Sequence, residues 1–286
     1  MNEITRNAYA KINLALDVLR RREDGYHEVK MIMQTLDICD ELTFRKVAQK
    51  GITIQVDDSM VPNNQENLIY KAAMLLLEKE YRECGVEITL KKVIPVAAGM
   101  AGGSSDAAAT FLAINELFEL GKSKEELMKL GVQIGADIPY CIMGGTALAE
   151  GIGEVLTALT PAPNPYVLVA KPEVAVATQF VYKNLQVDTI PYHPNIERMI
   201  SSIEKQNLQE LCEDMVNVLE TVTIVEYPII GTWKEKMKAC GAITALMSGS
   251  GPTVFGVFET RETCKKAYEI FEKDTAVKQL FQTRFR

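Results

Sequence analysis

Hydrophobic and polar residues alternate strictly over residues 7–19, and this pattern predicts a β-strand near the start of the chain. One face of this strand is apolar throughout. Lys11 and Asn13 lie two positions apart on the other face, so their side chains are expected to project in the same direction. The polar cluster at residues 20–25 predicts the first reversal of the chain.

Further elements follow along the whole chain. Segments with the composition of strands occur at residues 28–37, 41–47, 51–56, 86–92, 166–170, 243–247 and 253–258. Apolar residues at helical spacing predict helices at residues 68–79, 123–134, 178–185, 195–205, 208–220, 229–240 and 262–273. An alanine-rich run to about residue 120 follows Ser104, Ser105 and Asp106, which are candidate caps or first-turn residues of another helix.

The order of these elements predicts an α+β fold in two parts of similar size. Three prolines fall within residues 160–165. Because few contacts cross a proline-rich polar stretch, we expect a domain boundary there, between an N-terminal domain of residues 1–160 and a C-terminal domain of residues 161–286.

The composition narrows the functional classes. Of the 286 residues 47% are hydrophobic and 24% charged, which argues against disorder. The 31 basic and 38 acidic side chains give a net charge of −7, which disfavours binding to nucleic acid. The longest apolar runs are far shorter than the roughly 20 residues that cross a bilayer, and the six cysteines stand singly, without metal or redox spacing. We therefore expect a soluble cytoplasmic protein that binds neither a membrane nor nucleic acid.

The glycine-rich segment from Pro95 to Asp106 carries the strongest local signal. Glycines let the backbone approach a ligand, and the following helix directs its unpaired N–H groups and the positive end of its dipole toward the loop. This combination predicts an anion site. The segment lacks the lysine of a Walker A loop and the spacing of a dinucleotide-binding loop, so a phosphate needs its cationic partner from elsewhere. Taken alone, such a loop can also be a purely structural turn.

Together with residues 10–14 (Ala-Lys-Ile-Asn-Leu) and 247–253 (Met-Ser-Gly-Ser-Gly-Pro-Thr), this loop resembles the three signature segments of the GHMP kinases. The resemblance implies an N-terminal half like domain 2 of ribosomal protein S5, a C-terminal α/β sandwich half, and an active site in the cleft between them. One departure is Ala101, where some relatives carry another glycine.

Three further motifs point to one branch of this superfamily: residues 22–27 (Arg-Glu-Asp-Gly-Tyr-His), residues 67–68 (Asn-Leu) and residues 135–139 (Gly-Ala-Asp-Ile-Pro). The resemblance is weaker after about Phe180. It implies transfer of the γ-phosphoryl group of ATP to the 2-hydroxyl of 4-diphosphocytidyl-2-C-methyl-D-erythritol, in the non-mevalonate pathway to isoprenoids. The alternatives are another small-molecule kinase of the superfamily, of homoserine or mevalonate type, and a catalytically silent ligand sensor.

The resemblance also implies roles for two charged residues. Asp137 is expected to act as the general base that accepts the proton of the hydroxyl. Lys11 is expected to pair with Asp137 and with the transferring phosphoryl group, which keeps the base ionised. Without the resemblance, Asp137 is as well explained as a helix cap or solvated charge, and Lys11 as a charge at a strand edge. The catalytic assignment therefore requires the two to be neighbours.

A larger set of residues is assigned to ATP by the same resemblance: Asn67, Leu68, Lys92, Pro95, Gly99, Met100, Ala101, Gly102, Gly103, Ser104 and Ser105. The loop residues are expected at the phosphates, and Asn67, Leu68 and Lys92 nearer the adenosine, although Lys92 also fits an exposed charge at a strand end. Residues 248–253 are expected to join the site or only to form a tight turn. Mg²⁺ is expected with ATP, but no carboxylate cluster identifies its ligands, and Ser105 is only a possible one.

Five residues are expected to bind the substrate: Asn13, Tyr26, His27, Asp137 and Tyr182. Tyr26 and His27 supply a ring and a hydrogen-bonding edge, which suit a cytosine. Tyr182 is a candidate for the other side of the stack. The alternatives are an aromatic ring packed under a hairpin turn for Tyr26 and burial on a helix face for Tyr182. The chain is expected to be a monomer or a homodimer.

Overall fold

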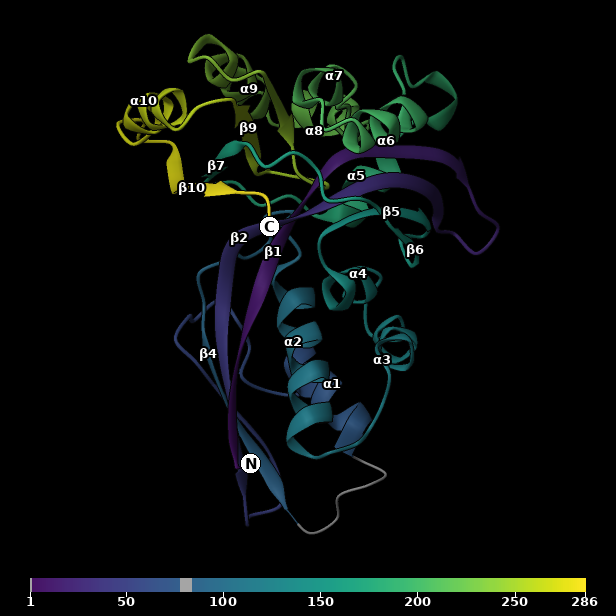
Figure 1. Cartoon of the computed structure of the whole chain (residues 1–286), viewed down its shortest axis with the longest axis vertical. Helices are drawn as coiled ribbons and strands as arrows, with labels where there is room; N and C mark the ends of the chain where they lie inside the picture. Colours follow the sequence, from purple (N-terminus) through teal and green to yellow (C-terminus); the bar gives the residue numbers. More distant parts are fainter. Residues whose placement is uncertain (1, 78–83) are drawn as a thin grey trace. The chain divides into compact units, whose positions relative to one another are not determined.

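A computed structural model describes residues 2–77 and 84–286 of the chain (Figure 1). The chain forms two compact units, each built from separate stretches of sequence. The first unit comprises residues 1–10, 38–96 and 101–144, and the second comprises residues 11–37, 97–100 and 145–286. The predicted boundary at residues 160–161 divides the chain into two continuous stretches, unlike these units, and stays a prediction.

Strands β1 (Glu3–Arg21) and β2 (His27–Val47) pair with each other, and each contributes residues to both units. The alternation over residues 7–19 correctly predicts β1, but both of its faces are buried between Ala10 and Val18. The two strands predicted at 28–37 and 41–47 are one continuous strand. Asp40, whose polar character suggests a break between them, is fully buried inside β2.

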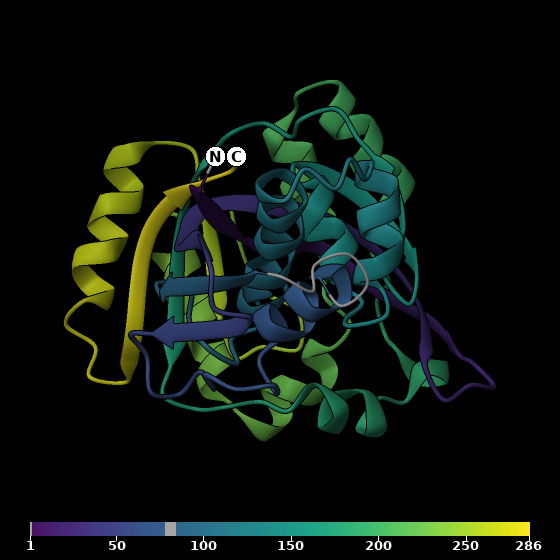
Figure 2. The ribbon, with the colours of Figure 1, turned by 90° about the horizontal axis from the view of Figure 1, so that it is seen from below.

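In the first unit, helices cover one face of a sheet in successive layers (Figure 2). Strand β4 (Gly85–Lys91) runs antiparallel to the end of β2 and parallel to β3 (Gly51–Val56). Figure 2 shows α1 (Leu68–Leu77) and α2 (Gly102–Leu117) on one side of these strands. Helices α3 (Lys124–Gly131) and α4 (Ile138–Met143) pack against α2.

The sequence explains this packing. The alanines at residues 107–109 of α2 are buried, and their small side chains let neighbouring helices approach closely. Phe44 and Ile88 of the sheet and Phe111 of α2 belong to the same fully buried core. Helix α1 begins as predicted, and the last two residues of the predicted helix, 78 and 79, lie outside the described residues. Helix α4 was not predicted.

The second unit contains a short antiparallel extension of β2 and a separate four-stranded sheet. Strands β5 (Thr146–Gly151) and β6 (Val155–Ala158) form the extension. The separate sheet has the antiparallel order β10-β7-β9-β8, with β7 at Tyr166–Pro172, β8 at Thr244–Met247, β9 at Val254–Phe258 and β10 at Val277–Arg284. Strands β5, β6 and β10 were not predicted.

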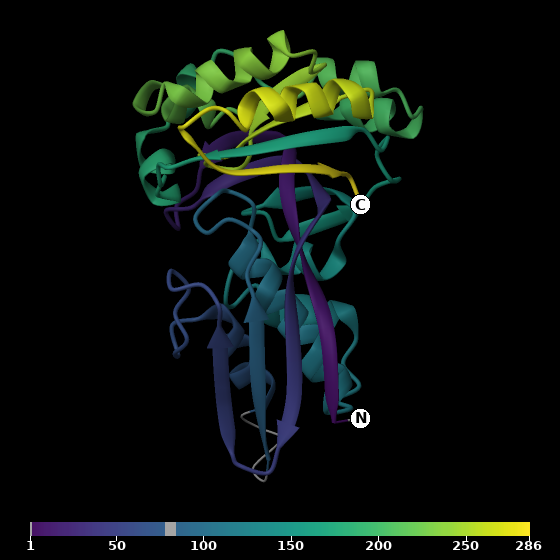
Figure 3. The ribbon, with the colours of Figure 1, turned by 90° about the vertical axis from the view of Figure 1, so that its left-hand side faces the viewer.

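Helices α9 (Ile229–Ala239) and α10 (Arg261–Phe271) lie on one side of the four-stranded sheet (Figure 3). They meet through Trp233 and Phe271, whose ring centroids are 5.7 Å apart in an edge-to-face arrangement. The rest of this unit comprises α5 (Thr178–Asn184), the short 3₁₀ helix η1 (Val187–Thr189), α6 (Ile196–Glu204), α7 (Leu208–Glu213) and α8 (Glu220–Glu226).

The single helix predicted at residues 208–220 is wrong. Helix α7 ends at Glu213 and α8 begins at Glu220, with an irregular segment between them. Within this segment, the amide nitrogen of Leu16 donates to the carbonyl oxygen of Val216, and that of Val218 donates to Leu16. Pairing with β1 therefore replaces the helix that local periodicity favours. Among the described residues, no helix has both the length and the apolar character that crossing a membrane requires.

Candidate active site

The glycine-rich loop is fixed in the second unit by its contact with the turn between β8 and β9. Gly99 has a φ of +70°, and a Cβ atom built there would collide with the carbonyl oxygen of Ser248. The hydroxyl of Ser248 donates to the carbonyl oxygen of Gly99 at 2.9 Å. Two signature segments that lie almost 150 positions apart in the sequence are therefore in direct contact, which only glycine at position 99 allows. Residues 248–253 do form the predicted tight turn, and they also support the loop.

Two residues that sequence reasoning missed hold this turn in place. The side-chain amide of Asn217 donates to the carbonyl oxygens of Met247 and Gly249, at 2.8 and 2.7 Å. The carboxylate of Glu220 accepts from the amide nitrogen of Met247 at 2.8 Å and pairs with Lys234. Burial raises the pKa of Glu220, against the opposing effect of the Lys234 charge. The only signal in the sequence was a polar Asn217 within an apolar stretch.

The first unit supplies the helix that follows the loop. Helix α2 begins at Gly102, and the residue before it, Ala101, has a φ of +55° and no side-chain hydrogen bond that caps the helix. An uncapped helix start presents backbone N–H groups and the positive end of the helix dipole, which together suit a phosphate. Because Ser105 donates its hydroxyl to the carbonyl oxygen of Tyr9 at 2.5 Å and is buried, its side chain is already engaged.

Asn67 and Leu68 lie beside this helix start. Asn67 accepts from the amide nitrogen of Ile69 at 2.9 Å and donates to the carbonyl oxygen of Pro62 at 2.6 Å, so it fixes the start of α1. A Cβ atom on Gly103 would lie 3.5 Å from Cδ1 of Leu68. The structure therefore brings this predicted pair next to the loop, while their part in binding adenosine stays a prediction.

Lys92 is not an exposed charge at a strand end. Its side chain is 4% exposed, and its ammonium nitrogen lies 2.5 Å from Asp40 and 2.7 Å from Asp106, both buried. Burial acts to lower the pKa of Lys92, but the charges of Asp106 and Asp40 outweigh it and raise that pKa. The ammonium group is therefore charged and held by two carboxyl groups, and Asp40 is a further residue that sequence reasoning missed.

Lys11 and Asn13 project in the same direction, as predicted. The ammonium nitrogen of Lys11 donates to the side-chain oxygen of Asn13 at 2.9 Å, and both residues are almost completely buried. The backbone nitrogen of Lys11 donates to the carbonyl oxygen of Met100 at 3.1 Å. The first signature segment thus contacts the glycine-rich loop within the second unit.

Asp137 belongs to the first unit, at the residue that precedes α4. Its side chain is half-buried and does not cap the helix. A Cβ atom on Gly135, in the same turn, would lie 3.9 Å from the hydroxyl of Ser104, so the turn is close to the start of α2. Lys11 and Asp137 belong to different units, and their pairing stays a prediction.

Three aromatic residues of the second unit were predicted to bind the substrate. The rings of His27 and Tyr182 lie together, with centroids 5.2 Å apart and a tilt of 38°, while Tyr26 is 61% exposed. Burial, with the Arg21 charge nearby, lowers the pKa of His27, so its ring is neutral at pH 7. Thr178 fixes the start of α5, the helix that carries Tyr182, through a 2.8 Å hydrogen bond to Ser250. A neutral imidazole offers both a donor and an acceptor to a base edge.

Carboxylate ligands for Mg²⁺ are not grouped in the part of the chain that the structure describes. Within the described part of the chain, no three acidic, histidine or cysteine side chains are grouped as metal ligands. Ser105, the possible ligand, uses its hydroxyl within the protein, and Asp106 pairs with Lys92.

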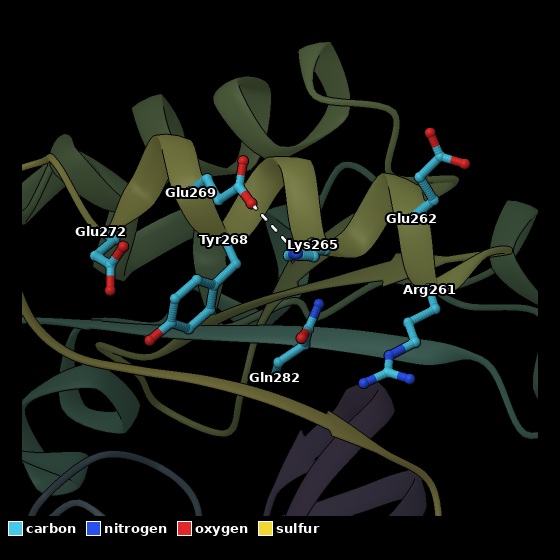
Figure 4. Close-up of a pocket in the computed structure, with 7 residues that line it drawn as sticks. All are labelled: Arg261, Glu262, Lys265, Tyr268, Glu269, Glu272 and Gln282. Carbon is cyan, nitrogen blue, oxygen red and sulfur yellow. Dashed lines mark ion pairs between the residues drawn. The ribbon is translucent and has the colours of Figure 1, made fainter.

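A hollow lies between α10 and β10 (Figure 4). It is lined by charged side chains such as Lys265 and Glu269, which pair at 3.8 Å, and by none of the predicted site residues. This hollow is therefore unsuited to the predicted phosphoryl transfer.

Comparison with known proteins identifies the family. Two family models match this chain, "GHMP kinases N terminal domain" over residues 67–145 and "GHMP kinases C terminal" over residues 199–276. A relative from Lachnoclostridium phytofermentans, named 4-diphosphocytidyl-2-C-methyl-D-erythritol kinase, is 50% identical over 285 residues, which cover 100% of this chain and 98% of the relative. This chain belongs to the GHMP kinases, in the family of 4-diphosphocytidyl-2-C-methyl-D-erythritol kinases.

Solved structures agree with this assignment. A crystal structure of a 4-(cytidine 5′-diphospho)-2C-methyl-D-erythritol kinase matches with a TM-score of 0.85 at 32% identity, covering 99% of both chains. A homoserine kinase from Cytophaga hutchinsonii matches with a TM-score of 0.78 at 20% identity, over 99% of this chain and 95% of that one, which shows a shared fold. The predicted GHMP kinase fold and phosphotransferase class are confirmed. Membership of a kinase family implies ATP as a substrate.

Proposed function

We propose that this GHMP kinase transfers the γ-phosphoryl group of ATP to the 2-hydroxyl of 4-diphosphocytidyl-2-C-methyl-D-erythritol and releases ADP. The observation that carries this proposal is the 50% identity, over the whole chain, to a relative of that name. It is supported by the contact between the rings of His27 and Tyr182, with the exposed Tyr26 next to His27 in the sequence, which suits a cytosine.

In this proposal the glycine-rich loop holds ATP. The phosphates lie against the backbone of residues 99–105 and the uncapped start of α2, where the helix dipole favours negative charge. Asn67 and Leu68, at the start of α1, lie nearer the adenosine. The four main-chain and side-chain contacts that fix Gly99, Met100, Met247 and Gly249 keep the loop in one conformation, which favours in-line transfer.

Asp137 would accept the proton of the 2-hydroxyl as the oxygen attacks phosphorus, since it is half-buried and not used as a helix cap. Lys11 would pair with Asp137 and offset the charge that develops on the transferring phosphoryl group. Asn13, bonded to Lys11, would orient that ammonium group and contact the substrate. Because phosphoryl transfer needs little covalent chemistry from the protein, positioning and charge account for most of these roles.

The nucleotide would enter with Mg²⁺ held by its phosphates and by water, since the described residues offer no ligand cluster of their own. The six cysteines, which form no disulfide in the described part of the chain, and the use of ATP support a reducing, cytoplasmic location. The net charge of −7 supports a small-molecule substrate rather than nucleic acid. A monomer or a homodimer stays the expected assembly.

The proposal is tested by measuring ADP release with ATP and Mg²⁺ and three acceptors: the cytidylylated methylerythritol, homoserine and mevalonate. We expect kcat/KM for the cytidylylated acceptor to exceed that for the other two by at least about 10³-fold, because a site built to pair with a polar base discriminates strongly against ligands that lack it. Faster turnover of homoserine or mevalonate would contradict the proposed substrate. Binding of the cytidylylated acceptor without ADP release would instead indicate a ligand sensor.

Asp137→Asn tests the catalytic role. We expect kcat to fall about 10²–10⁴-fold with a KM for ATP within about twofold of the wild type, because the amide keeps the shape of the side chain and cannot accept the proton. Glu125→Gln, an exposed acidic residue in the first turn of α3, is the matched control and should leave kcat unchanged. An Asp137→Asn enzyme with full turnover would exclude this residue as the base.

A further inference from the structure

A buried ionic cluster joins the two ends of the glycine-rich loop in the first unit. Lys92 stands three residues before Pro95, where the loop begins, and Asp106 follows Ser105, where it ends. The Lys92 ammonium group donates to Asp106 and to Asp40, which lies within β2. The other oxygen of Asp40 accepts from the amide nitrogens of Val93 and Ile94, at 2.6 and 2.8 Å.

This cluster lies directly beneath the start of α2. A Cβ atom on Gly102, the first residue of the helix, would lie 3.0 Å from the Lys92 ammonium nitrogen and 3.1 Å from Ile94. The Lys92 ammonium group and Ile94 therefore pack closely against the first turn of α2. That turn carries the N–H groups to which phosphate binding is assigned.

The charges of the cluster do not cancel. Two carboxyl groups face one ammonium group, their side chains are 0% and 3% exposed, and one oxygen of Asp106 has no hydrogen-bond partner. Burial raises the pKa of Asp106 to about 8, against the opposing charge of Lys92 and together with that of Asp40. Among the described residues, Lys92 and Asp40 are the charged groups that act on Asp106. The raised pKa favours the protonated, neutral form of Asp106.

We propose that Lys92, Asp40 and Asp106 form a buried clasp that holds the two ends of the ATP-binding loop at a fixed spacing, so that all three are positioning residues for the nucleotide phosphates. This inference rests on the proposal that the loop binds ATP. It differs from the sequence prediction for Lys92, because the side chain acts from beneath the loop through the backbone and not by contact with adenosine. Loss of the proton from Asp106 would add a negative charge near the start of α2, where the phosphates are proposed to bind.

The test measures equilibrium binding of a non-hydrolysable ATP analogue with Mg²⁺, by calorimetry, to the full-length protein. At pH 7.5 we expect Lys92→Met to weaken binding about tenfold, roughly the value of one hydrogen bond to a charged group. Lys91→Met is the matched control, since Lys91 is the neighbouring residue and pairs with Glu41 on the exposed side of the sheet. It should bind the analogue within about twofold of the wild type.

A second readout separates positioning from a purely structural role. For the wild type, the dissociation constant of the analogue should rise several-fold between about pH 7 and pH 9. In Asp106→Asn the side chain at position 106 does not titrate, so the dissociation constant of this variant should not change over the same range. The same pH dependence in both proteins, or equally tight binding by Lys92→Met and Lys91→Met, would overturn the inference. Because no cytidylylated acceptor is present, failure of the proposed acceptor specificity leaves this measurement unaffected.

Discussion

At the scale of single residues, several titratable side chains lie in the buried interior, where most proteins have apolar groups. Lys11, Asp40, Lys92 and Asp106 are all buried, and each has a polar partner. Burial of an ion without a partner costs several kcal/mol, so these groups are tolerated in the interior because each has a polar partner. Because burying these side chains lowers the stability of the fold, we expect them to affect the glycine-rich loop that they contact.

Asp106 gives a pH dependence of stability that follows from its raised pKa. Between its ordinary value of 3.8 and about 8, the folded chain holds a proton that the unfolded chain has lost. The free energy of unfolding therefore falls as the pH rises through this window, by at most about 1.4 kcal/mol per pH unit, and levels off above it. Asp106→Asn should remove this contribution.

The measurement is urea unfolding of the wild type and of Asp106→Asn at about pH 5 and pH 8. The stability of the variant relative to the wild type should increase from the lower to the higher pH. A constant difference between the two proteins would mean that Asp106 is ionised throughout, as an ordinary salt-bridged carboxylate is.

At the scale of elements, the glycine-rich loop depends on a backbone contact at Gly99 that leaves no space for a side chain. Gly99 and Gly121 have nearly the same φ, +70° and +67°, but a Cβ atom meets nothing within 4 Å at Gly121 and collides with Ser248 at Gly99. Alanine is strained by about 1–2 kcal/mol at either position. Gly99→Ala should therefore be less stable than Gly121→Ala by a further 1–3 kcal/mol, about the cost of overpacking.

Chemical unfolding of both variants measures this difference, and the KM for ATP gives a second comparison. Gly99→Ala should raise the KM for ATP, because the loop must move away from the β8–β9 turn, whereas Gly121→Ala should not. Equal stabilities for the two variants would show that the loop moves away from Ser248 without cost.

The elements also show what a sequence can and cannot reveal. Strand β1 and helices such as α6 and α10 were predictable because their side chains repeat with the period of the element. The break between α7 and α8 was not predictable, because the backbone there forms hydrogen bonds with β1. The continuity of β2 was missed because Asp40, a polar residue, lies in the middle of the strand. The site motifs were found through a family resemblance. Asn217 and Asp40 were missed because their partners are backbone groups far away in sequence, which no local pattern marks.

At the scale of the whole molecule, the chain passes from one compact unit to the other five times, at residues 10, 37, 96, 100 and 144. Strands β1 and β2 and the glycine-rich loop each contribute to both units. Since neither unit is a continuous stretch of sequence, neither should unfold while the other keeps its strands intact. We expect one cooperative transition rather than two.

Calorimetry with and without the ATP analogue tests this expectation. At about 100 times its dissociation constant, a ligand stabilises the folded state by about 2.7 kcal/mol. The whole transition should therefore move to higher temperature as one peak. Two peaks, of which only one moves with the analogue, would show that the units unfold independently.

The shared strands also affect how the protein is made. Residues 29–34 of β2 pair with β5, which begins more than 110 positions later, at Thr146. At about 5–20 residues per second, a ribosome needs roughly 6–20 s to supply that partner. Throughout that interval the nascent chain presents an apolar strand edge of the kind that pairs with other chains. Slowing elongation between codons 35 and 146 should therefore increase aggregation during synthesis. The activity of the protein that folds correctly should not change.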